Sequence, residues 1–365
     1  MGCRVGLVGL PNVGKSTIFN ALTTAGALVG NYPFCTIDPN VGVVSVPDPL
    51  LGRLAALYEP ERVIPTTLEV VDIAGLVKGA SKGEGLGNQF LGHIRNVDLI
   101  AYILRTFEDP SVVALSGAID PKADLEVLET ELLLADLEVL GRRIEKIERL
   151  ARVGAEGALE EKTHLSILYE ALAEGKSRSE VRGLPAEVLT QADAFNVLSV
   201  KPSLVLLNCS ERDLPEPGQR TREQIDGLSV AGFSVLILCG KLEAELAGMD
   251  EEERKQWLRD YGLQEPGLSR FIRMAYDLLG LVTFYTAGPK EVRAWTVPRG
   301  TTARQAAGEI HSDFERGFIR AEVMAAEALL ELGSEHILKE RGLVRSEGKD
   351  YIVKPGDVIT FRFNV

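Results

Sequence analysis

The sequence predicts an α/β protein in three parts: a parallel-sheet domain, a helical hairpin inserted into it, and a small α+β domain at the end of the chain. Strand-like and helix-like runs alternate over residues 1–121 and again over residues 200–280, which predicts the split sheet domain. A heptad-like apolar seam predicts helices over residues 122–199. Two strand-like runs, a helix and a final alternating run predict the last domain, residues 281–365.

The composition is that of an ordinary globular protein of 365 residues, with 45% hydrophobic and 25% charged residues. The net charge of −13 argues against a uniformly basic nucleic-acid-binding surface, although local basic patches are compatible with it. The four cysteines are far apart and lack metal-ligand spacing. No run is long and apolar enough to span a membrane. We therefore expect a cytoplasmic protein with reduced thiols and no membrane partner.

A complete phosphate-binding loop lies near the start of the chain. Residues 9–16 read Gly-Leu-Pro-Asn-Val-Gly-Lys-Ser, between a strand-like run at residues 5–9 and a helix-like run at residues 17–22. The glycines let successive backbone N–H groups point at phosphate oxygens. In this motif Lys15 binds the β- and γ-phosphates and Ser16 binds Mg²⁺. The sequence therefore predicts a nucleotide site.

Two further motifs fit the same site. Asp72 ends a predicted strand, where a carboxylate can hold Mg²⁺ or its water, and the amide of Gly75 can approach the γ-phosphate. Thr36 lies in the loop between the motifs, where a hydroxyl can meet Mg²⁺ and the γ-phosphate; the alternative is an ordinary connecting turn. The predicted catalytic residues are Lys15, Thr36, Asp72 and Gly75.

The end of the strand predicted at residues 203–208 bears on which base is bound. Guanine-binding proteins carry Asn-Lys-x-Asp here, whereas this chain has Asn208-Cys-Ser-Glu211. Cys209 cannot pack over a base as a lysine stem does. Adenine has an N1 acceptor and no N2 amine, so a carboxylate placed for guanine would repel it. In guanine-binding proteins the aspartate accepts from both guanine N1–H and the N2 amine, an arrangement we call the guanine fork. Its loss here favours ATP. The alternatives are that Glu211 still reaches guanine or faces solvent.

Slow hydrolysis is expected from Leu76, which stands where related hydrolases carry the glutamine that orients the attacking water. A flexible glycine-rich segment over residues 78–92 could respond to the γ-phosphate, or could be a solvated loop.

The inserted part is predicted to contain helices near residues 123–153, 159–172 and 186–198. The first carries the seam Leu133, Leu137, Leu140, Ile144 and Ile147. Gly154 and Gly157 separate the first two helices, which predicts an antiparallel hairpin. Five basic residues of the first helix could meet RNA phosphate, but interleaved glutamates favour a salt-bridged solvated face.

Taken together, these motifs resemble the Obg-like ATPase family, YchF type. Three runs of the C-terminal part add to the resemblance: residues 284–288, 291–295 and 311–320. The resemblance covers essentially the whole chain. It implies a Ras-like P-loop NTPase domain, an inserted antiparallel coiled-coil hairpin and a C-terminal TGS domain of ubiquitin-like α+β fold.

The resemblance also implies a cytoplasmic monomer that prefers ATP to GTP, hydrolyses it slowly with Mg²⁺, and associates with the ribosome, through its large subunit, or with RNA. It implies that phosphates are bound by Asn12, Val13, Gly14, Lys15, Ser16 and Thr17. Ser16 and Thr36 would bind Mg²⁺, and Asn208 with Cys209 would line the adenine site. In related potassium-stimulated enzymes an asparagine at the place of Asn12 helps bind K⁺.

One departure stands out, because Ala114 lies where some relatives have a histidine. Two other functions remain open: a guanine-nucleotide switch GTPase, and a ribosome- or RNA-binding module that nucleotide merely stabilises.

Overall fold

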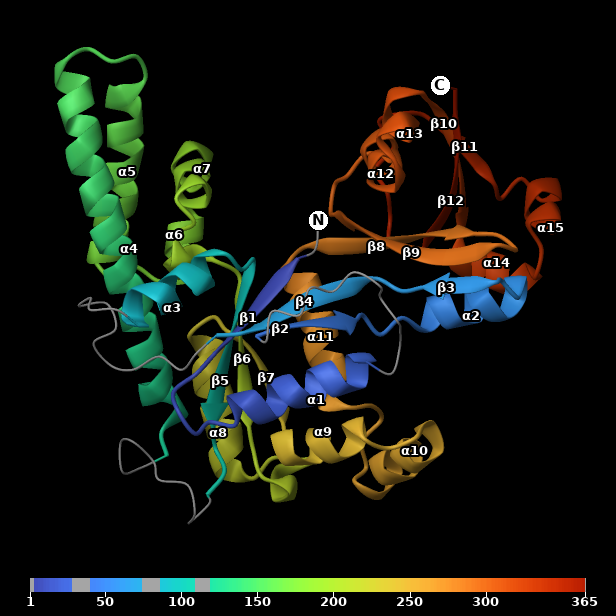
Figure 1. Ribbon diagram of the computed structural model, residues 1–365, viewed down its shortest axis with the longest axis horizontal. Helices are drawn as coiled ribbons and strands as arrows, with labels where there is room; N and C mark the ends of the chain where they lie inside the picture. Colours follow the sequence, from blue (N-terminus) through green and yellow to red (C-terminus); the bar gives the residue numbers. More distant parts are fainter. Residues whose placement is uncertain (1–2, 28–39, 74–85, 109–118, 365) are drawn as a thin grey trace. The chain divides into compact units, whose positions relative to one another are not determined.

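The computed structural model describes residues 3–27, 40–73, 86–108 and 119–364 (Figure 1). The chain forms two compact units. The first comprises Met1–Val44 and Glu69–Phe271, and the second comprises Ser45–Leu68 and Ile272–Val365. The last boundary along the chain, between Phe271 and Ile272, falls within α11 (Gly267–Leu278).

The first unit is built on a six-stranded sheet of order β2-β4-β1-β5-β6-β7. Five neighbouring strands, from β4 to β7, run parallel. The strands are β1 (Arg4–Val8), β2 (Val41–Ser45), β4 (Thr67–Asp72), β5 (Leu99–Arg105), β6 (Ser203–Asn208) and β7 (Ser234–Leu238). Every residue of the central strand β5 is buried, because helices cover both faces of the sheet.

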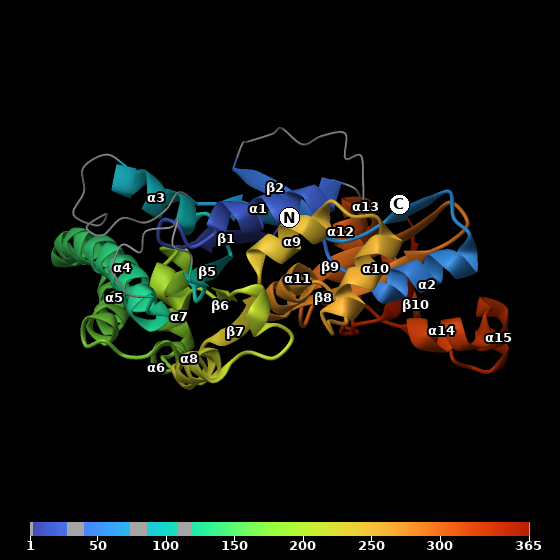
Figure 2. The same cartoon turned by 90° about the horizontal axis from the view of Figure 1, so that it is seen from below.

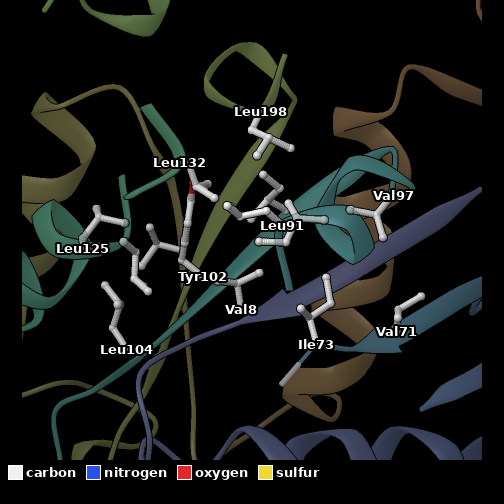
Figure 3. Packing of buried hydrophobic residues seen from close by; sticks show 14 of the residues in the cluster. Val8, Val71, Ile73, Leu91, Val97, Tyr102, Leu104, Leu125, Leu132 and Leu198 are labelled. Carbon is white, nitrogen blue, oxygen red and sulfur yellow. The ribbon is translucent and has the colours of Figure 1, made fainter. Parts of the chain in front are cut away.

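The main hydrophobic core joins this sheet to the helices on one of its faces. Tyr102 of β5 and Ile73, just after β4, pack with Leu91 of α3 (Leu86–Arg95) and Leu125 of α4 (Pro121–Arg152), as Figure 3 shows. Leu228 of α8 (Gln219–Val230) extends the same core. The parallel strands are thereby held in register, with their carboxyl ends along one edge of the sheet.

On the phosphate-loop side, α1 (Lys15–Ala27) packs beside α9 (Gly240–Ala247), and both views show the two helices side by side (Figures 1 and 2). The close approach needs Gly240, because a Cβ there would lie 3.2 Å from Ile18 Cγ1 and 3.2 Å from Asn208 Oδ1. Two further helices follow, α10 (Glu251–Asp260) and α11.

The predicted hairpin corresponds to α4 and α5 (Ala158–Ala173), which lie side by side in both views (Figures 1 and 2). The seam predicted from the sequence faces α5: Leu140 and Ile147 are buried, and Leu133, Leu137 and Ile144 pack against them. Asp120 caps α4 by accepting from the Lys122 and Ala123 amides at 3.1 Å each.

The third predicted helix is shorter than expected. It ends at Ala194 as α7 (Ala186–Ala194), and Leu198–Val200 forms a separate 3-10 turn. A short helix that the sequence did not indicate, α6 (Arg178–Arg182), precedes α7.

Two groups of polar residues fasten the inserted helices to the sheet domain. Arg178 of α6 donates to the Glu129 carboxylate of α4 at 2.6 Å and to the Tyr102 hydroxyl at 3.1 Å. Asp136 of α4 is fully buried and accepts from the Leu198 and Ser199 amides at 3.0 and 2.7 Å. Burial raises the pKa of Asp136, although these hydrogen bonds oppose the change.

The arginines of α4 mostly pair with glutamates of the hairpin. Arg142 pairs with Glu138 one turn earlier, Arg152 pairs with Glu148 at 3.3 Å, and Arg143 bridges to α5. The salt-bridged face favoured by the sequence is therefore the arrangement that forms.

The second unit contains another six-stranded sheet, of order β11-β10-β12-β8-β9-β3. Its strands are β3 (Arg62–Ile64), β8 (Leu281–Ala287), β9 (Glu291–Pro298), β10 (Phe318–Ala325), β11 (Arg345–Glu347) and β12 (Asp357–Phe363). Its helices are α2 (Pro49–Tyr58), α12 (Ala303–Ile310), α13 (Ser312–Arg316), α14 (Ala326–Leu332) and α15 (Glu335–Glu340).

Both faces of this second sheet are buried, and side chains alternate between them as a strand requires. Phe284 of β8 packs on the face covered by α12, and its neighbour Tyr285 packs on the face covered by α2 and α14. Ile359 and Phe361 of β12 are buried as the alternating pattern predicts, whereas Phe363 is 39% exposed at the end of the strand.

The structure differs from the predicted domain boundaries in two respects: residues 272–280 and residues 45–68 both fall in the second unit. Residues 45–68 were assigned by sequence to the nucleotide-binding domain, but they belong to the second unit. Leu51 and Leu54 of α2 are buried against Tyr285, and the Tyr285 hydroxyl donates to Asp48, the cap of α2, at 2.8 Å. β3 also pairs in parallel with β9. Burial of α2 and pairing of β3 explain why the segment separates from its sequence neighbours.

Across the described ranges, no helix is long and apolar enough to cross a membrane.

Candidate nucleotide-binding site

The phosphate-binding motif lies between the end of β1 and the start of α1, as its sequence context predicts. Two of its residues adopt left-handed backbone conformations, Asn12 with φ of 67° and Gly14 with φ of 90°. Asparagine tolerates this region better than most residues. Gly14 is also restricted by space, because a Cβ there would lie 2.2 Å from Asn208 Nδ2. The loop conformation thus depends on the residue types of the motif.

Lys15 and Asp72 meet at the carboxyl edge of the sheet. Asp72 is the last residue of β4, which pairs with β1 so that Leu7 lies opposite Asp72. The Lys15 ammonium forms an ion pair with the Asp72 carboxylate. Their side chains are only 11% and 16% exposed, so the pair is weakly screened by solvent. The structure therefore brings together two of the four predicted catalytic residues.

The other two predicted catalytic residues, Thr36 and Gly75, lie outside the described residues, as do Leu76 and Ala114. Their predicted roles stay predictions.

Ser16 and Thr17 form the first turn of α1, and both residues are exposed. The amides of a first helical turn lack intrahelical partners, which makes this end a favourable place for phosphate. Ser16 offers a hydroxyl oxygen, and Asp72 a carboxylate oxygen, at the same edge of the sheet. These are hard oxygen ligands of the kind that Mg²⁺ prefers. The described part of the site therefore fits Mg²⁺.

Asn208 connects three parts of the site through hydrogen bonds. Its side-chain Nδ2 donates to the Val13 carbonyl at 2.9 Å, and its Oδ1 accepts from the Gly240 amide at 2.9 Å. Its own carbonyl accepts from the Thr106 amide at 3.0 Å. With only 5% of its surface exposed, Asn208 joins the phosphate loop to the ends of β5 and β7. The described partners of its side chain are thus backbone groups of the protein.

The side chain of Cys209 lies in the apolar core, and the expected place of this residue in the adenine site stays a prediction. Cys209 is 2% exposed and packs with Cys239, Leu242, Leu246 and Leu258. Burial raises the pKa of its thiol to about 12, so the thiol stays neutral and apolar in character. A cysteine points inward here because the small side chain completes this apolar cluster.

Glu211 opens a short 3-10 turn, Glu211–Asp213, just beyond β6. Its Oε1 accepts from Lys241 Nζ at 3.0 Å, and its Oε2 accepts from the Tyr261 hydroxyl at 3.3 Å. The Lys241 hydrogen bond is the main cause of the lowered pKa of Glu211. Each carboxylate oxygen therefore already has a partner within the protein.

Gly240 and Lys241 are site residues that the sequence reasoning missed. The sequence contains a signal for them, because Cys-Gly-Lys at residues 239–241 directly follows the apolar run that forms β7. In the structure the end of β7 lies beside the end of β6. Tyr261 carried no such signal, because it is brought in by the packing of α10.

Comparisons with known proteins agree with this arrangement. A family model described as "50S ribosome-binding GTPase" matches residues 4–135. The YchF-GTPase C-terminal model, described as "Protein of unknown function (DUF933)", matches residues 281–364. The nucleotide-binding unit thus has the α/β fold of P-loop GTPases.

Relatives match over the full chain. The "Ribosome-binding ATPase YchF" of Haemophilus influenzae is 49% identical and that of Bacillus subtilis 48% identical, each aligned over 100% of both chains. A solved structure, "Structure of the Schizosaccharomyces pombe YchF GTPase", is 34% identical with a TM-score of 0.87, covering 99% of this chain and 98% of that one. The chain therefore belongs to the YchF family.

Proposed function

We propose that this protein binds ATP in preference to GTP, hydrolyses it slowly with Mg²⁺, and acts as a nucleotide-dependent switch on or near the ribosome. The observation that carries the base preference is the position of Cys209. In a guanine site this position would supply a lysine stem over the base, whereas here the side chain is buried in the core.

The state of Glu211 supports the same preference. Guanine presents N1–H and an N2 amine, which a single carboxylate can accept together. Both oxygens of Glu211 are engaged by Lys241 and Tyr261. Guanine would have to compete with these partners, whereas adenine presents no such pair of donors.

For the phosphates, we assign Lys15 as the main positive charge and the residues Asn12 to Thr17 as the binding loop. Phosphate oxygens would compete with Asp72 for the Lys15 ammonium, since the two residues form an ion pair. Ser16, Thr36 and Asp72 would hold Mg²⁺ directly or through water. When bound, Mg²⁺ neutralises charge on the phosphate oxygens. Asn12, whose side chain is exposed beside the loop, would help to bind K⁺.

Slow hydrolysis follows from the residues available to orient water. Leucine at position 76 has no hydrogen-bonding group in its side chain, so it cannot position an attacking water. We expect turnover below about 1 s⁻¹, the low end of ordinary enzymes.

The proposed ribosome partner rests on the names of the relatives, which are ribosome-binding ATPases, and on the "50S ribosome-binding GTPase" model. A second candidate, a GTPase switch, is favoured by the word GTPase in that family model and in the name of the Schizosaccharomyces pombe relative. A cytoplasmic monomer that binds the large subunit is the form we propose.

The experiment combines turnover with ribosome cosedimentation. The wild-type chain should hydrolyse ATP slowly in Mg²⁺, and its binding to ribosomes should change between ATP and ADP. Lys15→Ala should abolish both effects, whereas the matched control Lys255→Ala, a surface lysine paired with Glu251, should change neither. Full ribosome binding by Lys15→Ala, insensitive to nucleotide, would instead support a nucleotide-stabilised binding module.

A further inference from the structure

Three elements that are distant in sequence converge on the Glu211 carboxylate. Glu211 begins the 3-10 turn after β6, Lys241 lies in the first turn of α9, and Tyr261 is the C-terminal cap of α10. All three lie in the first unit, and the first two follow adjacent parallel strands.

Each oxygen of the Glu211 carboxylate accepts one hydrogen bond: Lys241 Nζ donates to Oε1 at 3.0 Å, and the Tyr261 hydroxyl donates to Oε2 at 3.3 Å. A guanine fork would need both oxygens turned toward the base. The pair of contacts therefore fixes the rotation of the carboxylate about its last bond.

Tyr261 is itself held in place. Its ring stacks on Trp257 with centroids 5.6 Å apart and an interplanar angle of 19°, and both rings pack against the cluster that buries Cys209. The hydroxyl is consequently presented from a fixed ring, so orienting it costs little conformational entropy on binding Glu211. Lys241 has less packing around it, since its side chain is 74% exposed.

We propose that Lys241 and Tyr261 are specificity-determining positioning residues that hold Glu211 away from a guanine-binding orientation. This inference rests on the proposed ATP preference and explains how a carboxylate can remain next to the base-binding end of β6 without selecting GTP. Glu211 stays ionised and therefore remains an acceptor, because Lys241 lowers its pKa. Removing the hydrogen bond from Lys241 or from Tyr261 should allow Glu211 to turn toward guanine and restore part of the guanine fork.

The test measures dissociation constants for ATP, GTP and ITP by titration calorimetry in Mg²⁺. Tyr261→Phe keeps the stacked ring and removes only the hydroxyl, and Lys241→Met keeps the apolar stem and removes the ammonium. Each variant should lower the ratio Kd(GTP)/Kd(ATP) by about three- to tenfold, the effect expected of one hydrogen bond or exposed ion pair. ITP lacks the N2 amine, so it should gain less than GTP.

Two controls separate positioning from a structural role. In a Glu211→Gln background, Tyr261→Phe and Lys241→Met should leave the ratio unchanged, because their effect acts through the carboxylate. Lys255→Met, which removes an exposed ammonium paired with Glu251 at 2.8 Å, should also leave it unchanged. A general structural defect would weaken ATP and GTP binding together and leave their ratio where it was.

The outcomes distinguish the two claims. A wild-type ratio at or below one would refute the ATP preference. Ratios that do not fall in Tyr261→Phe and Lys241→Met, or that fall equally in the Glu211→Gln background, would refute the positioning role whatever the wild-type ratio is.

Discussion

At the residue scale, the site depends on one buried amide. Asn208 satisfies the Val13 carbonyl and the Gly240 amide at 2.9 Å each, and it occupies the space that a side chain at position 14 would need. One side chain thus forms hydrogen bonds to residues 13 and 240, which are far apart in the sequence of the first unit. The conformation of the phosphate-binding loop is therefore set partly by Asn208, a residue that lies outside the phosphate-binding motif.

Asn208→Ala should destabilise the first unit by about 2–6 kcal/mol, because it leaves two backbone groups without this partner and each costs about 1–3 kcal/mol. ATP affinity should fall with it. Thermal unfolding and calorimetric titration would measure the two effects. The control Gln219→Ala removes an exposed amide bonded to Glu223 and should change stability by less than about 0.5 kcal/mol. Wild-type stability in Asn208→Ala would contradict the role given to this side chain.

Gly14→Ala should prevent nucleotide binding, because the new methyl group would lie 2.2 Å from Asn208 Nδ2 and φ is 90°. Part of the damage is a clash, so Gly14→Ala combined with Asn208→Ala should be less harmful than the sum of the two changes. A stability cycle over the four proteins measures this coupling. Strict additivity would show that Asn208 does not limit the space at position 14.

At the element scale, the inserted helices are joined to the sheet by ionised and polar groups as well as by apolar contacts. Arg178 of α6 links Glu129 of α4 to Tyr102 of β5 and donates to the Lys201 carbonyl at 2.8 Å. Asp136 links α4 to the turn that leads back into the sheet. These contacts specify where the hairpin starts and ends relative to the strands of its own unit.

Arg178→Met should therefore destabilise the first unit by about 1–3 kcal/mol, since it removes the charged partner of the part-buried Glu129, which keeps the Tyr102 hydroxyl as a donor. Hydrogen exchange should rise most in α4 and α6. Arg142→Met is the matched control, because Arg142 is 76% exposed and pairs with Glu138 on the surface of the same hairpin. A similar loss of stability in the two variants would contradict the distinction between the part-buried pair of Arg178 and the exposed pair of Arg142.

At the scale of the whole molecule, sequence order and structural unit do not coincide. Residues 45–68 lie between the phosphate loop and Asp72 in sequence, yet they belong to the second unit. Leu54 of α2 is fully buried in the core of that unit, beside Tyr285 and Leu329. The polypeptide therefore leaves the nucleotide-binding unit after β2 and returns to it as β4.

Leu54→Ala should destabilise the second unit by about 3–5 kcal/mol through loss of a buried side chain and formation of a cavity. Hydrogen exchange measured by mass spectrometry should increase in β8 and β12. Leu22→Ala is the matched control, since Leu22 of α1 is equally buried but lies in the first unit, so exchange should increase in β1 and β5 instead. The same pattern of exchange in both variants would contradict the division into units.

Much of this organisation was predictable from the sequence, for physical reasons that can be named. β6 coincides with its predicted run because it is short, continuous and apolar, bounded by polar or turn residues. The hairpin seam was readable because its period matches a packed helix. By contrast, the start of α2 is marked in the sequence by the N-cap Asp48 and by Pro49. No neighbouring residue, however, indicates that its buried face packs on β8, more than about 200 residues further along the chain.

The site shows the same division. Lys15 and Asp72 were found because their motifs carry the chemistry in adjacent residues, and the structure brings them together. The sequence showed that Cys209 replaces the lysine of guanine-binding proteins, but it could not show which way this small side chain points. It could not reveal the contact of Tyr261 with Glu211 either, because that contact depends on how α10 packs.

The central claim is the preference for ATP, and side-by-side calorimetric titration of the intact chain with ATP and GTP, both with Mg²⁺, tests it most directly. Our account predicts that ATP binds at least about tenfold more tightly, a difference of about 1.4 kcal/mol. Equal affinities, or tighter binding of GTP, would contradict it.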